Sequence, residues 1–353
     1  MRPKRHRSKA PLPAALVAVA LFVLGAPEAQ AISFVKPDCA DSATNTGCAH
    51  PNTVSLSGFR ASAPDKPPVA GVSSLLCSGS LLDKTGERIV ILSAGHCVSA
   101  YLAGLQDGSL VDVGVSFDAL IARELPPPFS PASWSPTQYV LGGQPVLPLE
   151  YGSESANARS LHFDYAVIVY EIPPGGLVTQ GGEPVDLSAI EPVNLPDEGF
   201  LDDLVSATDP ALVTAVGYGA GQDHRAPGEG GRKGAPNDTS VFGVRFMAGE
   251  TGLTHFVGPN RSLVFGAQNP ARGINGSCGG GSGGPIFYDG FLGEIQVGVT
   301  SSGDAICLGS AIAARIDGTE AQEFLNCVLG ASETAGIAEC GCIEVDKQGA
   351  CAL

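Results

Sequence analysis

The sequence is poor in basic residues, and this shortage excludes several classes of partner. Lysine and arginine number 20 against 36 aspartates and glutamates, and five of the basic residues lie in the first nine positions. Residues 32–353 therefore carry 15 basic against 35 acidic side chains. A chain this acidic repels nucleic-acid phosphates and anionic lipid surfaces. We expect neither a nucleic acid nor a membrane as its partner.

Long apolar runs are also missing, with one exception near the start. Residues 12–24 (LPAALVAVALFVL) follow a basic stretch and precede the small-x-small triplet of residues 29–31 (AQA). The run is shorter than the ~18 apolar residues of a membrane-spanning helix, and its flanks are typical of a secretory signal. We therefore predict a signal peptide over residues 1–31, cleavage before Ile32, and a secreted protein, extracellular or periplasmic.

The spacings that mark metal sites are absent as well. The chain has no C-x-x-C, no H-E-x-x-H and only six histidines, so we expect no metal and no cofactor. No ligand spacing argues for calcium either. All ten cysteines follow the predicted signal, and an even count in an oxidising compartment indicates disulfide bonds. Cys39 and Cys48 are close enough in sequence to pair with each other.

Turn-forming residues are abundant, with 47 glycines and 27 prolines. From Val69 onward, short β-rich runs alternate with turn clusters, which favours an all-β sandwich or barrel over parallel βαβ units. Those runs are residues 73–82, 88–95, 164–172, 211–219, 240–249, 284–288, 294–302 and 309–316. Helical spacing is convincing only over residues 318–329.

Three segments fall outside this strand pattern. Residues 32–68, rich in Pro, Ser, Asn and Asp, predict an irregular N-terminal segment, and residues 173–200 predict a connector between two β units. Residues 330–353 are too few for a core of their own, so disulfides must hold them. Three connectivities remain open among the four cysteines in and just before this tail, which are Cys327, Cys340, Cys342 and Cys351.

A glycine-rich turn surrounds Ser282, in the run GGSGGP of residues 280–285. A nucleophilic hydroxyl needs backbone N–H donors close to the developing oxyanion, and neighbours without side chains let the chain turn tightly enough to supply them. The same letters satisfy the G-x-S-x-G of α/β-hydrolases, whose histidine follows the serine. No histidine follows Ser282, which excludes that class. A flexible loop without chemistry is the other interpretation.

The base for such a serine must come from upstream. His96 has the best context, because an apolar strand ends in small residues directly before it (LSAGHC, residues 92–97). His162 is a weaker candidate, two residues before Asp164 and without a following cysteine. A structural role is the common alternative for a lone histidine.

Together these motifs resemble the chymotrypsin/trypsin-like secreted serine proteases. Residues 93–97 (SAGHC) resemble that family's T-A-A-H-C, and residues 278–285 (CGGGSGGP) resemble its C-x-G-D-S-G-G-P. Four further segments resemble family motifs in the same order. They are residues 77–82 (CSGSLL), 163–168 (FDYAVI), 216–219 (VGYG) and 298–303 (GVTSSG).

The resemblance implies a protease domain over residues 69–329, made of two antiparallel β-barrels with the active site between them and a short C-terminal helix. Surface insertions are expected around residues 104–160 and 220–237. By the same resemblance Ser282 is the nucleophile, His96 the general base and Asp164 the residue that orients it. The implied oxyanion donors are the N–H groups of Gly280 and Ser282, and the implied disulfides are Cys77–Cys97 and Cys278–Cys307.

The resemblance also locates the primary specificity pocket. Its floor is Gly276 with Ser277 beside it, and its walls include Ser301, Gly303 and Ala311. No carboxylate lies in residues 275–281, so we expect an open, largely uncharged pocket that favours an apolar or medium-sized side chain. Asp304, at the rim, is the one residue placed to supply a charge for arginine or lysine.

Gly281 is a departure from the family pattern. The family has an aspartate there, which pairs with the amino group freed by zymogen cleavage, and no Arg or Lys followed by Ile/Val-x-Gly precedes Cys77. The resemblance implies a serine endopeptidase that acts on polypeptides, with a monomer favoured as its oligomeric state, and Gly281 predicts that it lacks trypsinogen-type activation. The alternatives are a catalytically impaired, protease-like binding protein and a secreted esterase on the same scaffold.

Overall fold

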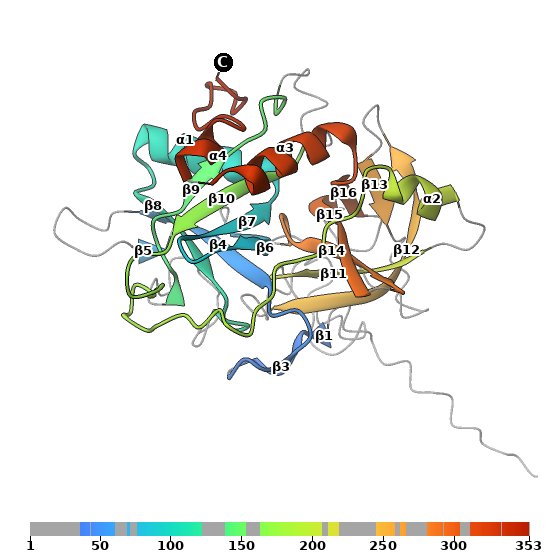
Figure 1. Cartoon of the computed structure of the whole chain (residues 1–353), viewed down its shortest axis with the longest axis horizontal. Helices are drawn as coiled ribbons and strands as arrows, with labels where there is room; N and C mark the ends of the chain where they lie inside the picture. Colours follow the sequence, from blue (N-terminus) through green and yellow to red (C-terminus); the bar gives the residue numbers. More distant parts are fainter. Residues whose placement is uncertain are drawn as a thin grey trace, which may run out of the picture. The chain divides into compact units, whose positions relative to one another are not determined.

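Strands outnumber helices in the computed structural model of the chain (Figure 1), so the mainly-β prediction is confirmed. The described residues all belong to one unit, Ala31–Leu353. The predicted signal peptide lies outside them. No described helix is long and apolar enough to cross a membrane. The structure describes residues 36–42, 44–60, 69–70, 76–121, 138–152, 163–206, 211–218, 245–257, 262–265, 281–291, 293–303, 311–332 and 334–352.

One seven-stranded antiparallel sheet carries the turn of Ser282. Its order is β1-β12-β11-β14-β15-β16-β13, and because β12 also pairs with β13, six of its strands form a ring. Alternate side chains of these strands, such as Ile286, Val297 and Ala313, fill an apolar core. The strands are β1 (Lys36–Pro37), β11 (Leu212–Gly217), β12 (Phe246–Val257), β13 (Ser262–Phe265), β14 (Pro285–Gly290), β15 (Gly293–Gly303) and β16 (Ala311–Arg315).

A second seven-stranded sheet contains β7, the strand that leads to His96. Its order is β5-β4-β6-β7-β10-β9, with β8 paired to the other side of β4. Between β8 and the segment before β9, the described residues show a single isolated bridge, Val115 to Val140. The strands are β4 (Thr53–Arg60), β5 (Val69–Ala70), β6 (Cys77–Lys84), β7 (Arg88–Ser93), β8 (Asp112–Ser116), β9 (Gln144–Val146) and β10 (Ala166–Glu171).

Four helices lie among the described residues, α1 (Gly95–Asp107), α2 (Phe200–Ser206), α3 (Thr319–Gly330) and α4 (Thr334–Ala338). Helix α3 confirms the helix predicted over residues 318–329, and it buries Phe324, Leu325 and Val328. Helix α1 was not predicted. It continues from the end of β7 with no capping side chain at Ala94, so the local sequence carries no start signal for it.

Residues 32–68 are not irregular throughout, and that prediction is wrong. A two-stranded hairpin, β2 (Cys39–Asp41) and β3 (Thr46–Cys48), precedes β4. Strand β4 is buried at its first seven positions and pairs with both β6 and β8. Likewise β8 and β9 fall within residues 104–160, so that span is not only a surface insertion. Residues 173–200 do join the two sheets, and no strand or helix longer than a bridge forms in them before α2.

Four disulfides lie in the described part of the chain, Cys39–Cys48, Cys77–Cys97, Cys327–Cys340 and Cys342–Cys351. The first two were expected. The last two select one of the three connectivities left open, in which the tail is tied to α3 and to itself. Cys278 and Cys307 lie outside the described residues. Disulfides of this number fit an oxidising compartment.

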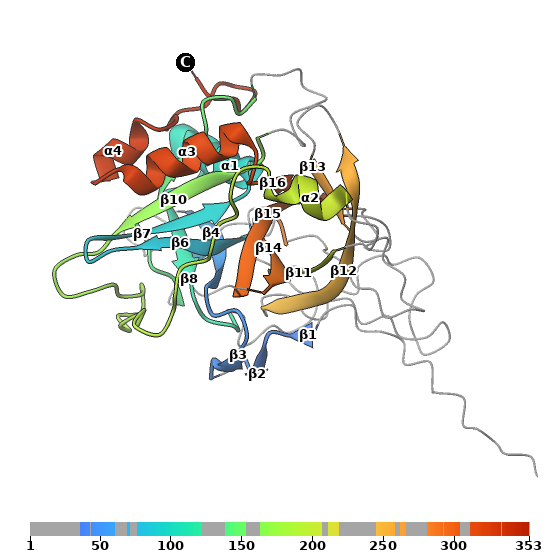
Figure 2. The ribbon, with the colours of Figure 1, turned by 45° about the vertical axis from the view of Figure 1, so that its right-hand side comes forward.

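The C-terminal tail packs against the sheet of His96 and against α1 (Figure 2). Cys342 forms a bridge with Leu147, beside β9. Ser99 Oγ of α1 donates a hydrogen bond of 2.6 Å to Gly349 O, and Gln106 Oε1 accepts one of 3.2 Å from Val345 N–H. The tail is therefore part of the same folded unit as the site.

Candidate active site

Strand pairing brings His96 and Asp164 together. Strands β7 and β10 are antiparallel, with Ser93 opposite Ala166. His96 follows Ser93 by three residues and Asp164 precedes Ala166 by two, so both lie at the same end of the pair. Phe163, directly before Asp164, has a φ of 53°, a left-handed conformation that bulky residues rarely adopt and that often accompanies functional sites.

Asp164 holds His96 through both its side chain and its backbone. The Nδ1–H of His96 lies 2.8 Å from Asp164 Oδ2 and 3.1 Å from Oδ1, and the backbone N–H of His96 donates to Oδ1 over 2.7 Å. That N–H lies in the first turn of α1, where helical N–H groups have no partner within the helix. The fully buried Asp164 carboxylate thus supplies the cap that Ala94 lacks and meets the positive end of the helix dipole.

Ser301 completes the surroundings of this carboxylate. Its Oγ donates a hydrogen bond of 2.5 Å to Asp164 Oδ2, and its side chain is buried on β15. Sequence reasoning assigned Ser301 to the specificity pocket and missed this contact. The two residues are 137 positions apart, and no local sequence pattern predicts which buried serine will donate a hydrogen bond to a carboxylate.

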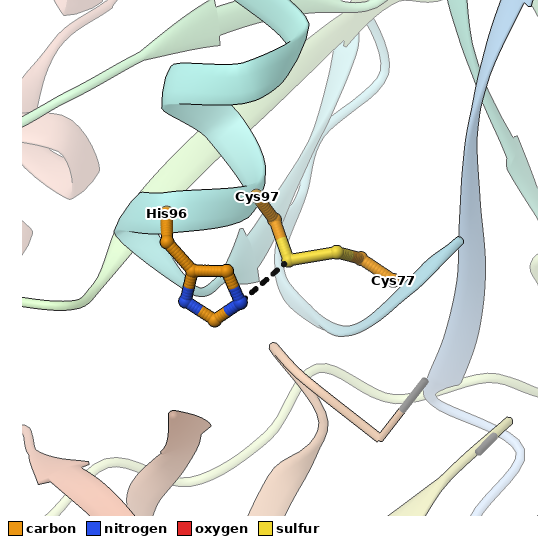
Figure 3. Close-up of side chains that lie close together, drawn as sticks. All are labelled: Cys77, His96 and Cys97. Atoms are coloured by element: carbon orange, nitrogen blue, oxygen red, sulfur yellow. Dashed lines mark hydrogen bonds between the residues drawn. A yellow bond between two sulfur atoms is a disulfide. The ribbon is translucent and has the colours of Figure 1, made fainter. Parts of the chain in front are cut away.

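The pKa of His96 reflects two opposing effects. Burial lowers it, but the charge of Asp164 and the hydrogen bond to that residue outweigh burial, so the pKa is raised above 6.5. The imidazole is 38% exposed and remains reachable from solvent. Its Nε2 lies 3.6 Å from Cys97 Sγ of the Cys77–Cys97 disulfide (Figure 3).

Ser282 lies in the turn before β14 and is partly exposed. Gly284 N–H donates to Gly281 O over 2.9 Å, which closes the turn. Ser282 O accepts a 2.7 Å hydrogen bond from Ser78 N–H, and Gly283 N–H donates to Thr300 O over 2.7 Å. The turn is thus fixed to β6 of one sheet and to β15 of the other.

Gly283 brings this turn against the strand that leads to His96. Its φ is +83°, and a Cβ on it would collide with Ser78 O and Ser93 Oγ and would lie 3.0 Å from Ala94 N. Only glycine allows both the conformation and the close approach. No hydrogen bond joins Ser282 Oγ to His96 Nε2 in the described part of the chain. Catalytic hydrogen bonds are often long before substrate binds.

The remaining predicted site residues are placed only in part. Gly303 pairs with Ala311 between β15 and β16, and Ala311 is fully buried in the apolar core of the first sheet. Five further residues of the predicted site lie outside the described residues. They are the pocket residues Gly276 and Ser277, the oxyanion donor Gly280, and the cysteines Cys278 and Cys307. His162 and the rim residue Asp304 lie outside them too.

Two clusters of the described residues bring potential metal ligands within 4.8 Å of one another. In both, the sulfurs are already bonded as cystines, Cys77–Cys97 and Cys39–Cys48. A disulfide sulfur is not the thiolate that metals bind. These clusters therefore offer one histidine or one carboxylate each.

No protein-family model and no curated protein matches the chain. A buried carboxylate orients an imidazole whose outer nitrogen is accessible, and a serine stands nearby in a rigid glycine turn. Such an arrangement suits proton transfer to and from a serine nucleophile.

Proposed function

We propose that the chain is a secreted serine endopeptidase of the chymotrypsin-like kind, in which two antiparallel β-barrels flank the active site. The observation that carries this proposal is the Asp164 carboxylate, which binds the backbone and ring of His96 together with Ser301 Oγ. A surface histidine without a chemical role would not need a buried carboxylate to fix the orientation of its ring. The turn of Ser282, fixed against the same strand end, supplies the nucleophile.

In this mechanism Ser282 Oγ attacks the scissile carbonyl while His96 Nε2 takes the hydroxyl proton. Asp164 holds the imidazole in the tautomer that leaves Nε2 free and stabilises the imidazolium that forms. His96 then protonates the leaving amine, and water hydrolyses the acyl-enzyme by the reverse sequence. The N–H groups of Gly280 and Ser282 are the proposed donors to the oxyanion.

The proposed substrate class is polypeptides with an apolar or medium-sized side chain before the scissile bond. The region predicted to form the pocket floor, residues 275–281, contains no carboxylate. An arginine buried there without a partner would carry a desolvation cost of several kcal/mol. Paired chromogenic peptides ending in Leu and in Arg test this preference, and a clear preference for Arg that disappears in Asp304→Asn would assign the charge to Asp304.

A serine-directed fluorophosphonate tests the function itself. We expect covalent labelling of the folded protein at Ser282, located by peptide mass spectrometry, and no labelling of Ser282→Ala. His96→Ala should abolish labelling too, because the hydroxyl then lacks its base. Absence of labelling in folded wild-type protein would overturn the proposal.

Two observations favour the second candidate, a protease-like binding protein. His96 Nε2 lies 3.6 Å from Cys97 Sγ and makes no hydrogen bond to Ser282 Oγ among the described residues. Gly281 also lacks the carboxylate that the resembling family has at this position. A folded, unlabelled protein that still binds peptides would support this second function.

A further inference from the structure

We propose that the hydroxyl of Ser78 is a positioning group that sets the Ser282 turn against the strand leading to His96. This inference rests on the proposed function and concerns a residue to which the sequence assigned no role. Ser78 is the second residue of β6 and is fully buried. In the family motif that residues 77–82 resemble, this position is a glycine, so the side chain is a feature of this chain.

Three segments of the site converge on Ser78. Its N–H donates to Ser282 O over 2.7 Å, and its carbonyl accepts a 2.7 Å hydrogen bond from Ser93 Oγ at the end of β7. Its Oγ accepts a 2.9 Å hydrogen bond from Tyr218 N–H, directly after β11. The backbone of Ser78 therefore links the nucleophile turn to the strand that leads to His96, and its side chain adds a second link from β6 to the sheet that carries this turn.

The hydroxyl is enclosed by residues that have no side chains of their own. A Cβ on Gly217 would lie 2.9 Å from Ser78 Oγ, and one on Gly284 would lie 3.3 Å from Ser78 Cβ. Tyr218 is fully buried, so its N–H loses its acceptor when the hydroxyl is removed. A buried donor without a partner recruits another acceptor or water, and either change displaces the chain around it.

Ser80 provides a matched control on the same strand. It is fully buried and lies on the same face of β6, and its Oγ donates a 2.7 Å hydrogen bond to Gln296 Oε1 of β15. Its side chain therefore also joins the two sheets. Among the described residues, its side chain makes no hydrogen bond to residues 281–284, so Ser80→Ala removes a comparable bond without changing a contact of the nucleophile turn.

The experiment compares Ser78→Ala and Ser78→Gly with Ser80→Ala. We expect both Ser78 variants to lower kcat by about 10- to 100-fold with KM changed less than about threefold, because small misplacements of a reacting group are costly in rate. The rate of fluorophosphonate labelling should fall by the same factor. Ser80→Ala should keep kcat within about threefold of wild type, even if its Tm falls by as much as the Tm of the Ser78 variants.

Hydrogen exchange supplies a readout that does not depend on activity. The amides of Gly283 and Thr300 bind Thr300 O and Gly284 O in the native turn, and we expect them to exchange faster in both Ser78 variants and unchanged in Ser80→Ala. Equal kcat losses at Ser78 and Ser80, or unchanged exchange at Gly283, would overturn the proposal. An unlabelled wild-type protein would count against the proposed function alone, because the exchange measurement still tests the positioning.

Discussion

Gly283 is the residue at which the backbone of the site is most tightly constrained. Alanine there would combine a φ of +83° with collisions against Ser78 O and Ser93 Oγ. We expect Gly283→Ala to lower the free energy of unfolding by about 2–4 kcal/mol through strain and overpacking, and to abolish turnover. Urea denaturation and peptide hydrolysis measure the two effects.

Gly293 is the control for that prediction. It also has a positive φ, +112°, but nothing lies within 4 Å of the position of its Cβ. Gly293→Ala should therefore show only the conformational strain, about 1–2 kcal/mol, with turnover unchanged. Equal effects of the two substitutions on turnover would contradict the role assigned to the Gly283 contacts.

The raised pKa of His96 fixes the direction of the pH dependence. Only the neutral imidazole accepts a proton, so kcat/KM should rise with pH through an apparent pKa above 6.5. In Asp164→Asn the charge that raises this pKa is gone while burial remains, so the rising limb should move to lower pH. We also expect kcat to fall about 10⁴-fold. A pH profile that does not move would contradict the assignment of Asp164.

The same pair contributes to stability with a definite sign. Because the folded pKa of His96 is raised, the stabilisation by Asp164 is fully present below about pH 6.5 and is lost as the pH rises through the folded value. The gain in activity and the loss of this stabilisation therefore occur over the same pH window.

At the scale of elements, the Cys77–Cys97 disulfide ties β6 to the first turn of α1, directly beside His96. Replacing both cysteines with alanine should cost about 3 kcal/mol in the free energy of unfolding, since the bond closes a loop of about 20 residues. It should also lower kcat, because the turn that carries His96 loses one of its supports. Thermal unfolding and peptide hydrolysis measure the two effects.

The Cys342–Cys351 pair is the comparison for that substitution. It closes a shorter loop, with a sequence separation of 9, and lies in the tail rather than beside the imidazole. Its double alanine variant should lose stability of similar magnitude while its kcat stays within about threefold of wild type. A parallel loss of kcat in both variants would show that the Cys77–Cys97 bond acts only through global stability.

The elements that the sequence did not predict share a physical cause. Strand β4 alternates serine or threonine with apolar residues, but its polar positions are buried too. Ser55, for example, meets Tyr139 OH at 3.0 Å, a partner 84 positions away. Helix α1 takes its cap from Asp164, 68 positions downstream of His96. Local patterns reveal strands such as β7 and β10, and they cannot reveal elements whose polar groups are satisfied by distant residues.

At the scale of the whole molecule, a buried ion network ties the N-terminal hairpin to the first sheet. His50 lies between Asp38, at 2.5 Å from Nδ1, and Glu294, at 3.0 Å from Nε2, and it stacks on Phe287 of β14. Asp38 also accepts a 2.8 Å hydrogen bond from Arg245 Nε. Burial lowers the pKa of His50, but these two carboxylates outweigh burial and raise it to about 9.

Stability should therefore decline at alkaline pH. The contribution of protonated His50 is fully present below about pH 6.5 and is lost as the pH rises through about 9, a change on the order of 3 kcal/mol. Urea denaturation between pH 6 and pH 10 should show this decline in the wild type and a flatter profile in His50→Gln. A wild-type profile as flat as that of the variant would contradict the assignment.

The same hairpin affects the prediction that activity does not require a free N-terminal amine. Gly281 offers no carboxylate to a new N-terminus, and the hairpin is already held by Asp38, His50 and the pairing of β1 with β12. We expect an N-terminal extension before Ile32 to leave kcat within about threefold of the unextended protein, measured by peptide hydrolysis. A hundredfold loss, about 2.7 kcal/mol in the barrier, would show that a free amine is needed after all.

The contacts between the tail and α1 have a consequence for biosynthesis. Gly349 is made 250 residues after Ser99, the helix residue that it binds. Until that tail has been synthesised, the helix carrying His96 lacks the contacts of Ser99 and Gln106 with it, and such long-range contacts form late in folding. A nascent chain thus carries all three proposed catalytic residues before their scaffold is complete.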